Sequence, residues 1–150
     1  MTLILVILWL CQAVAALSAG QVFSLKTVAA NAPDFDNLPI VVYADGILGL
    51  SDSQENDPKF RGVLMPEYGI ILQPEPLRVI KVTENNHLVM DTSLFNPATG
   101  FHERNGRLGL RNRQFVVCPT LNNTMRIDSG SLPVCPSFFR VELSLEEITR

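Results

Sequence analysis

The feature that most constrains the fold is a set of polar dipeptides that each separate two apolar runs of the chain. They occur at four places, which are Asp45-Gly46, Asn85-Asn86, Asn105-Gly106 and Asn122-Asn123. Two-residue hairpin loops of type I′ need a positive φ at both central residues, and Gly, Asn and Asp adopt this conformation at the lowest cost. The repeated pattern therefore predicts a chain of consecutive β-hairpins.

Short segments rich in Val, Ile, Leu and Phe lie between the turns and have the length and composition of β-strands. Two polar segments, Ala30–Pro39 and Ser51–Gly62, are expected to be loops. The last segment, Leu143–Arg150, is expected to be a short helical turn or a frayed tail. The expected strands are residues 22–28, 39–44, 47–50, 69–72, 77–82, 87–91, 107–110, 115–118, 125–128 and 138–143.

Three of the dipeptides, which begin at Asp45, Asn85 and Asn122, lie 40 and then 37 residues apart. The segments that start there read DGILGLSD, NNHLVMDT and NNTMRIDS, each a turn, alternating apolar residues and a polar close. Such a repeat suits a β-trefoil, although a barrel of simple hairpins remains an alternative. We predict an all-β, single-domain, closed antiparallel β-barrel built from hairpins, because closure removes exposed sheet edges.

The first segment, MTLILVILWLCQAVAALSAG, has the pattern of a secretory signal peptide, with an uncharged apolar run followed by small residues. A membrane anchor is the alternative. A spanning helix needs about 20 apolar residues, however, and Gln12, Ser18 and Gly20 interrupt this one. We predict a cleaved signal over residues 1–19 and a single secreted all-β domain over residues 20–150, with no membrane contact after cleavage.

Cysteine use agrees with export to an oxidising compartment. Cys11 lies in the expected signal, so Cys118 and Cys135 are the two that remain. Two cysteines have only one intramolecular pairing, which predicts a disulfide between them; the alternative is two free thiols. Asn122-Asn123-Thr124 is an N-x-T sequon on an expected hairpin turn, and it predicts N-glycosylation of Asn122.

The sequence carries no recognisable catalytic or metal-binding motif. His87 and His102 lack the spacing of a zinc site, and there is no G-x-S-x-G, P-loop or dinucleotide motif. The formal net charge of −3 disfavours nucleic-acid binding. We predict a monomeric protein that is not an enzyme, with no cofactor, metal or nucleic-acid partner. No spacing singles out a catalytic pair among the candidate acids Glu67, Glu75, Asp91 and Glu103.

The stretch RNGRLGLRNR carries four arginines in ten residues. Strand alternation places Leu108 and Leu110 on one face and Arg107 and Arg111 on the other. These two arginines and Arg113 are candidates for binding acidic glycans, phosphates or lipid headgroups. The alternative is that they lie on an outer strand and protect its edge from pairing with other chains.

Between Phe23 and Leu143 the chain contains, in order, FSLKTVAA, LPIVV, ADGILGL, YGIIL, NHLVMD, GRLGL, FVVCP and FFRVEL. This series resembles the small secreted fungal proteins of the phialide cell-wall, or PhiA-like, family. That family also includes hypersensitive-response elicitors and an allergenic wall protein. Where the family tends to have Ser-Pro-Ile-His, this chain has Leu38-Pro39-Ile40-Val41, which is a departure on the second expected strand.

The resemblance implies a secreted, non-catalytic β-barrel protein of the fungal cell wall or apoplast, recognised by a plant host as an effector or elicitor. Cell-wall polysaccharide and a host surface receptor are the partners we expect. The alternative is a secreted glycan- or small-ligand-binding barrel, which should expose an aromatic platform. Trp9 lies in the expected signal, so Tyr43 and Tyr68 are the only Trp or Tyr residues left for one.

Overall fold

The computed structural model of the chain describes residues 21–51, 57–120, 124–130, 135 and 137–148. These residues form an all-β protein of twelve strands and one short 3-10 turn, η1 (Pro33–Phe35). Across this part of the chain, no helix has the length and apolar character needed to cross a membrane. The strands are β1 (Phe23–Val28), β2 (Ile40–Val42), β3 (Leu48–Leu50), β4 (Val63–Met65), β5 (Ile70–Gln73), β6 (Arg78–Val82), β7 (Leu88–Asp91), β8 (Phe101–Arg104), β9 (Arg107–Leu110), β10 (Phe115–Pro119), β11 (Met125–Ser129) and β12 (Phe139–Glu147).

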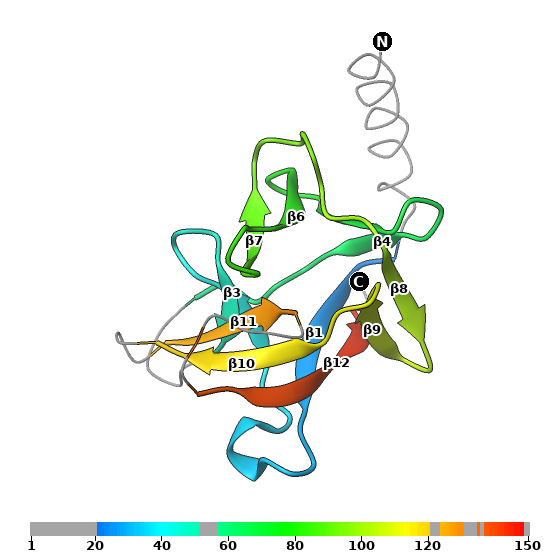
Figure 1. Cartoon of the computed structure of the whole chain (residues 1–150). Coiled ribbons are helices and arrows are strands. Elements are labelled where there is room, and N and C mark those ends of the chain that lie inside the picture. The colour runs from blue at the N-terminus through cyan, green and yellow to red at the C-terminus, as the bar shows by residue number, and fades with distance from the viewer. Residues whose placement is uncertain (1–20, 52–56, 121–123, 131–134, 136, 149–150) are drawn as a thin grey trace.

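Two antiparallel sheets contain these strands (Figure 1). The larger sheet has eight strands in the order β2-β3-β11-β10-β12-β9-β8, and β1 branches from it by pairing with β12. The smaller sheet has the order β4-β5-β6-β7. Because β12 is long enough to pair with β10 and then with β9, the strands β1, β12, β9 and β8 curl into a half-barrel. The prediction of an all-β chain of antiparallel hairpins is confirmed.

Backbone hydrogen bonds connect the half-barrel to the β4–β5 hairpin at two places. Phe23 on β1 and Gly62, directly before β4, exchange N–H···O bonds of 2.9 and 3.0 Å. Phe101 on β8 donates to the carbonyl of Gly69, directly before β5, at 3.0 Å. Each end of the β4–β5 hairpin is therefore attached to the half-barrel by a short backbone contact.

The turns are of two kinds, and the sequence predicts only one of them correctly. Asn105 and Gly106, between β8 and β9, have φ values of 53° and 76°, as the predicted two-residue type I′ loop requires. In the β2–β3 and β6–β7 hairpins only the last turn residue, Gly46 or Asn86, has a positive φ. Each of these turns contains three residues instead of the predicted two. In the β6–β7 hairpin, for example, the turn lies between Thr83 and His87, which are joined by a backbone hydrogen bond.

The remaining predicted turn, Asn122-Asn123, lies outside the described residues. The strands on either side of it pair as a hairpin, with Pro119 opposite Met125 and a Thr120 N–H to Thr124 O bond of 2.9 Å. The pairing of β10 with β11 therefore agrees with the predicted hairpin.

The hairpins β2–β3, β6–β7 and β10–β11 meet through their second strands. Ile47 bridges Val89, His87 bridges Asp128, and Arg126 pairs with Gly49, so each hairpin contacts the other two. The buried apolar side chains beneath them recur at the predicted spacing of about 40 residues. They are Leu48 and Leu50 in β3, Leu88 and Met90 in β7, and Ile127 in β11.

The segment 51–62 contains no named strand in its described part, as expected for a loop, but it holds a buried phenylalanine, and the expectation for the C-terminal end is wrong. Within the segment expected as a loop, Ser51–Gly62, Phe60 is fully buried and its N–H donates to the Ile40 carbonyl at 2.9 Å. The C-terminal segment is not helical, because β12 continues to Glu147 and runs antiparallel to β1. The local sequence indicates neither the burial of Phe60 nor the extended conformation of the C-terminal segment. Phe60 is held by its distant partner Ile40, and the end of β12 is held by β1.

Two strands, β4 and β8, are absent from the predicted set. β8 has a single buried residue, Phe101, followed by three exposed ones, so it lacks the alternation by which a strand is recognised. β4 has only three residues and directly follows the polar loop. Each is held in place by pairing with a neighbour, β9 or β5.

Candidate functional site

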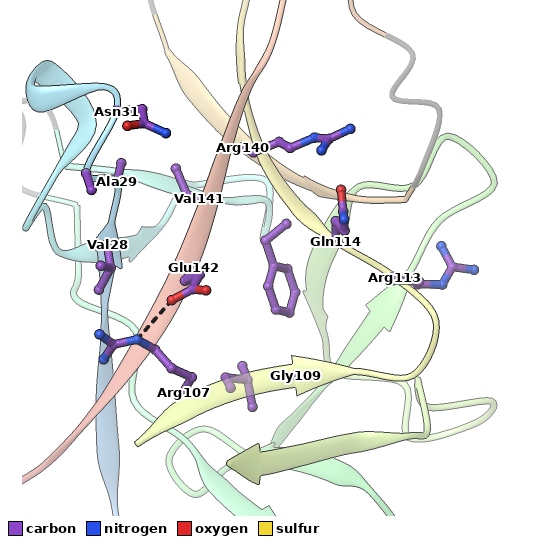
Figure 2. Close-up of a pocket in the computed structure, with 13 residues that line it drawn as sticks. Val28, Ala29, Asn31, Arg107, Gly109, Arg113, Gln114, Arg140, Val141 and Glu142 are labelled. Carbon is purple, nitrogen blue, oxygen red and sulfur yellow. Dashed lines mark hydrogen bonds and ion pairs between the residues drawn. The ribbon is translucent and has the colours of Figure 1, made fainter. Parts of the chain in front are cut away.

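A pocket of about 510 Å³ lies where β12 passes between β1 on one side and β9 and β10 on the other (Figure 2). This volume is within the range of about 300–1,000 Å³ that is usual for ligand sites. Apolar side chains line its base and polar ones line its rim. The lining residues are Val28, Ala29, Ala30, Asn31, Arg107, Leu108, Gly109, Arg113, Gln114, Phe115, Arg140, Val141 and Glu142.

The path of β12 explains why these residues meet. Its first residues pair with β10, placing Arg140 opposite Val116, and its later residues pair with β9, placing Ser144 opposite Arg107. Successive side chains of a strand point to opposite faces. Val141 is accordingly buried, whereas Arg140 and Glu142 are exposed on the outer face beside the pocket.

The pocket has two arginines whose charges are available to a ligand. Arg107 donates from Nε to Glu142 Oε2 at 3.2 Å, and the two side chains are 42% and 69% exposed (Figure 2). An ion pair so open to water contributes little to stability. The Arg140 side chain is exposed and makes no hydrogen bond or ion pair with any residue that the structure describes. Neither guanidinium is therefore locked into the fold.

The other two candidate arginines have different surroundings. Arg113 donates from Nη1 to Asn86 Oδ1 at 3.1 Å and to the Ser129 carbonyl at 3.4 Å, and its side chain points away from Val141 (Figure 2). It ties the β9–β10 connection to the β6–β7 turn. Arg111 is exposed and does not line the pocket. Of the three arginines that the sequence groups together, Arg107 and Arg113 thus line the pocket, whereas Arg111 does not.

The alternative interpretation of these arginines as protection for an outer strand is wrong. β9 has β8 on one side and β12 on the other, so it is not at the edge of its sheet. The predicted alternation is correct, since Leu108 and Leu110 are buried and Arg107 faces outward.

An exposed aromatic pair lies next to the pocket on the chain. Phe138 and Phe139 are 42% and 38% exposed and directly precede Arg140. The Phe139 ring packs against Phe35 of η1 with a centroid separation of 4.6 Å. The sequence did contain a signal for this surface, because two successive phenylalanines in a strand cannot both face the core.

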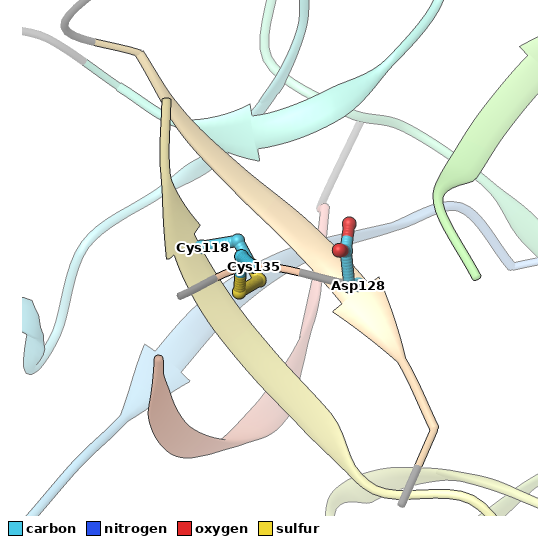
Figure 3. Close-up of side chains that lie close together, drawn as sticks. All are labelled: Cys118, Asp128 and Cys135. Carbon is cyan, nitrogen blue, oxygen red and sulfur yellow. A yellow bond between two sulfur atoms is a disulfide. The ribbon is translucent and has the colours of Figure 1, made fainter. Parts of the chain in front are cut away.

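The predicted disulfide between Cys118 and Cys135 is present, with a Cα–Cα separation of 6.0 Å (Figure 3). Asp128 lies beside it, and one ligand-type atom from each of the three residues falls within 4.8 Å of the others. Metal binding needs thiolate sulfurs, whereas these are joined to each other. Asp128 is fully buried and accepts from Arg126 Nε at 2.7 Å and Nη2 at 3.0 Å. The cluster is therefore structural.

Two titratable groups on the β6–β7 hairpin are shifted. Burial lowers the pKa of His87, with an added contribution from Arg126, while the carboxylates of Asp128 and Asp45 oppose the shift. The pKa of Asp91 is lowered, first by the Ser93 backbone N–H and then by Lys81. Both shifts arise from neighbours that are not part of the pocket.

Other candidate residues do not come together at this site. Glu67, Glu75, Asp91 and Glu103 are not among the pocket residues, and Glu142 is the acidic one. The predicted glycosylation site, Asn122, lies outside the described residues. By its fold and its site, the protein is therefore a disulfide-bonded β-protein with a pocket that is lined in part by arginines. No family model, curated protein or solved structure matches this chain.

Proposed function

We propose that the protein is a secreted, non-catalytic protein of the fungal cell wall or apoplast that binds polysaccharide through the pocket between β1, β9, β10 and β12. The observation that carries this proposal is the pocket itself, whose lining combines buried apolar residues with exposed polar ones. The exposed Phe138 and Phe139 directly precede one lining residue, Arg140, on the chain. A polar rim over an apolar base suits a sugar, which has hydroxyl edges and apolar faces.

The acidic groups of the pocket support binding without hydrolysis. Glycoside hydrolysis usually needs two carboxyl groups on opposite sides of the scissile bond. Among the described residues, Glu142 is the one carboxylate of the lining, and it is paired with Arg107. The expected resemblance to PhiA-like wall proteins agrees with a binding role of this kind.

We also propose that the strands form a closed barrel of the β-trefoil type. The pairs β1–β12, β4–β5 and β8–β9 would line the barrel, and the hairpins β2–β3, β6–β7 and β10–β11 would cap one end. The contacts of Phe23 with Gly62 and of Phe101 with Gly69 support closure. The mutual contacts of β3, β7 and β11 support the three-unit arrangement. A crystal structure in which β1 and β4 are separated would contradict closure.

Retention on insoluble wall material tests the proposed function. The purified secreted protein is incubated with fungal or plant cell walls, and the bound and free fractions are compared after washing. We expect a substantial bound fraction, and a smaller one for Phe139→Ala. The control is Phe95→Ala, because Phe95 is 47% exposed but is not a pocket residue. A protein that stays in the supernatant with every wall preparation would refute the function.

A further inference from the structure

The charge of the pocket is opposite to that of the chain. Among the described residues its lining contains Arg107, Arg113 and Arg140 but a single acid, Glu142, whereas the chain as a whole has a formal net charge of −3. A concave surface that gathers one sign of charge attracts ligands of the other sign and raises their local concentration. The pocket is therefore suited to a ligand with negative charge.

The positions of the two accessible guanidinium groups define where such a ligand would be held. Arg107 already binds a carboxylate, that of Glu142, at 3.2 Å in a partly exposed pair. Arg140 stands on the same strand as Glu142, two residues earlier, and has no partner among the described residues. A guanidinium presents a planar set of donors that matches a carboxylate in a bidentate geometry.

Neutral polar groups and rings complete the surroundings. Asn31 and Gln114 reach the rim of the pocket from the segments after β1 and before β10, and their amides can donate to and accept from hydroxyls. Phe139 directly precedes Arg140 on the chain, and its ring packs against that of Phe35. Carboxylate, hydroxyls and an apolar face together are the groups of a uronic acid in a polysaccharide chain.

We propose that the pocket selects an acidic polysaccharide, with separate uronate carboxylates bound by Arg140 and, in exchange for Glu142, by Arg107. The two arginine side chains extend to opposite sides of β12 (Figure 2). This inference rests on the proposed function, because it names the class of polysaccharide that the same pocket binds. It assigns to Glu142 the role of an internal competitor that occupies Arg107 when the ligand is absent.

Isothermal titration with a galacturonic acid trimer tests the inference directly, with a neutral galactose trimer as the matched ligand. We expect the acidic trimer to bind more tightly, and its affinity to fall as the salt concentration rises. Arg140→Gln should weaken binding of the acidic trimer by about tenfold, since a charge-assisted bidentate contact is lost. Arg111→Gln is the control, because Arg111 is equally exposed but outside the pocket.

A second variant distinguishes this site from general attraction to positive charge. Glu142→Gln should increase the affinity for the acidic trimer, because Arg107 is freed from its partner. All three substitutions are on exposed side chains, and the thermal midpoint of each variant shows whether it remains folded. Equal weakening by Arg140→Gln and Arg111→Gln, or no gain from Glu142→Gln, would overturn the site.

The failure of this inference is separable from the failure of the proposed function. Equal binding of the acidic and neutral trimers would overturn selection for an acid while leaving retention on walls intact. Inorganic phosphate that displaces the acidic trimer at equal concentration would overturn the uronate assignment in favour of a phosphate ligand. Failure of the wild-type protein to bind wall material would refute the proposed function itself.

Discussion

The hairpins β6–β7 and β10–β11 each carry an aspartate at the same place in a related segment, yet the two aspartates have opposite surroundings. Asp91 closes NNHLVMDT and is 41% exposed at its side chain, where Lys81 approaches to 3.1 Å. Asp128 closes NNTMRIDS and is fully buried, with both oxygens bound by Arg126. The two segments share a local sequence pattern, but Asp128 is buried and the side chain of Asp91 is not.

The difference arises from what covers each hairpin. Asp128 lies between the disulfide on one side and the β6–β7 hairpin on the other, where His87 bridges it (Figure 3). Asp91 lies at the end of β7 and is bound by the neighbouring Ser93 N–H and by Lys81. The comparison teaches that both hairpins bury apolar side chains, whereas β10–β11 has in addition a buried ion pair and a disulfide.

The largest effect is expected from removing the charge of the buried aspartate. Asp128→Asn leaves the Arg126 guanidinium without its carboxylate in a largely buried position. Breaking a buried ion pair in this way costs about 3 kcal/mol of unfolding free energy. Urea denaturation, followed by circular dichroism, measures the change.

Asp91→Asn is the matched control, because it makes the same chemical change at the corresponding place in the other hairpin. Asp91 is exposed and its pair with Lys81 is screened by water, so the urea midpoint should scarcely move. Equal destabilisation by the two substitutions would show that burial does not distinguish these hairpins.

Removing the disulfide, which the β6–β7 hairpin lacks, is expected to lower the free energy of unfolding by about as much as Asp128→Asn. Cys118 and Cys135 are 17 residues apart, and the chain-entropy model values a closed loop of this size at roughly 3 kcal/mol. In a Cys118→Ala/Cys135→Ala variant the amides of β10 and β11 should exchange hydrogen faster, while those of β6 and β7 change less.

Reduction of the wild-type protein provides the control for that variant. Dithiothreitol should lower the thermal midpoint of the wild type and leave that of the double variant unchanged. A fully reduced wild-type protein, verified by thiol alkylation, that keeps its original midpoint would refute a stabilising role for the bridge.

The smallest effect is expected where the two hairpins meet, at His87. Its pKa is lowered in the folded protein from the ordinary value of 6.5, chiefly by burial. As pH falls through 6.5, the unfolded chain takes up a proton that the folded chain resists, so stability decreases. Between about pH 7.5 and about pH 5.5, wild type should lose slightly more stability than His87→Gln. A larger loss in the variant would reverse the assigned sign of the shift.

Much of the strand content was predictable because it depends on local signals. Asn105-Gly106 forms the expected type I′ turn, and every described non-glycine residue with a positive φ is an asparagine. The strands β7 and β9 alternate between buried and partly exposed residues as the pattern indicates. β8 escaped prediction because three of its four residues are exposed.

The pocket was predictable only in part. Arg107 and Arg113 were candidates and do line it, whereas Arg140 and Glu142 were not singled out. Their part in the pocket depends on β12 crossing from β10 to β9, a register that no local pattern specifies. Phe138-Phe139 offered a signal, since adjacent residues of a strand face opposite sides.

The sequence by itself determined the β class, the hairpins and the cysteine pair. Turn conformation and strand alternation are properties of a few neighbouring residues, and two cysteines left one pairing. Only the tertiary structure decided that β9 is an inner strand, that Asp128 is buried while Asp91 is not, and that segments near Val28, Arg107 and Arg140 enclose one pocket. These features depend on contacts between distant parts of the chain, which a periodic pattern along the sequence does not record.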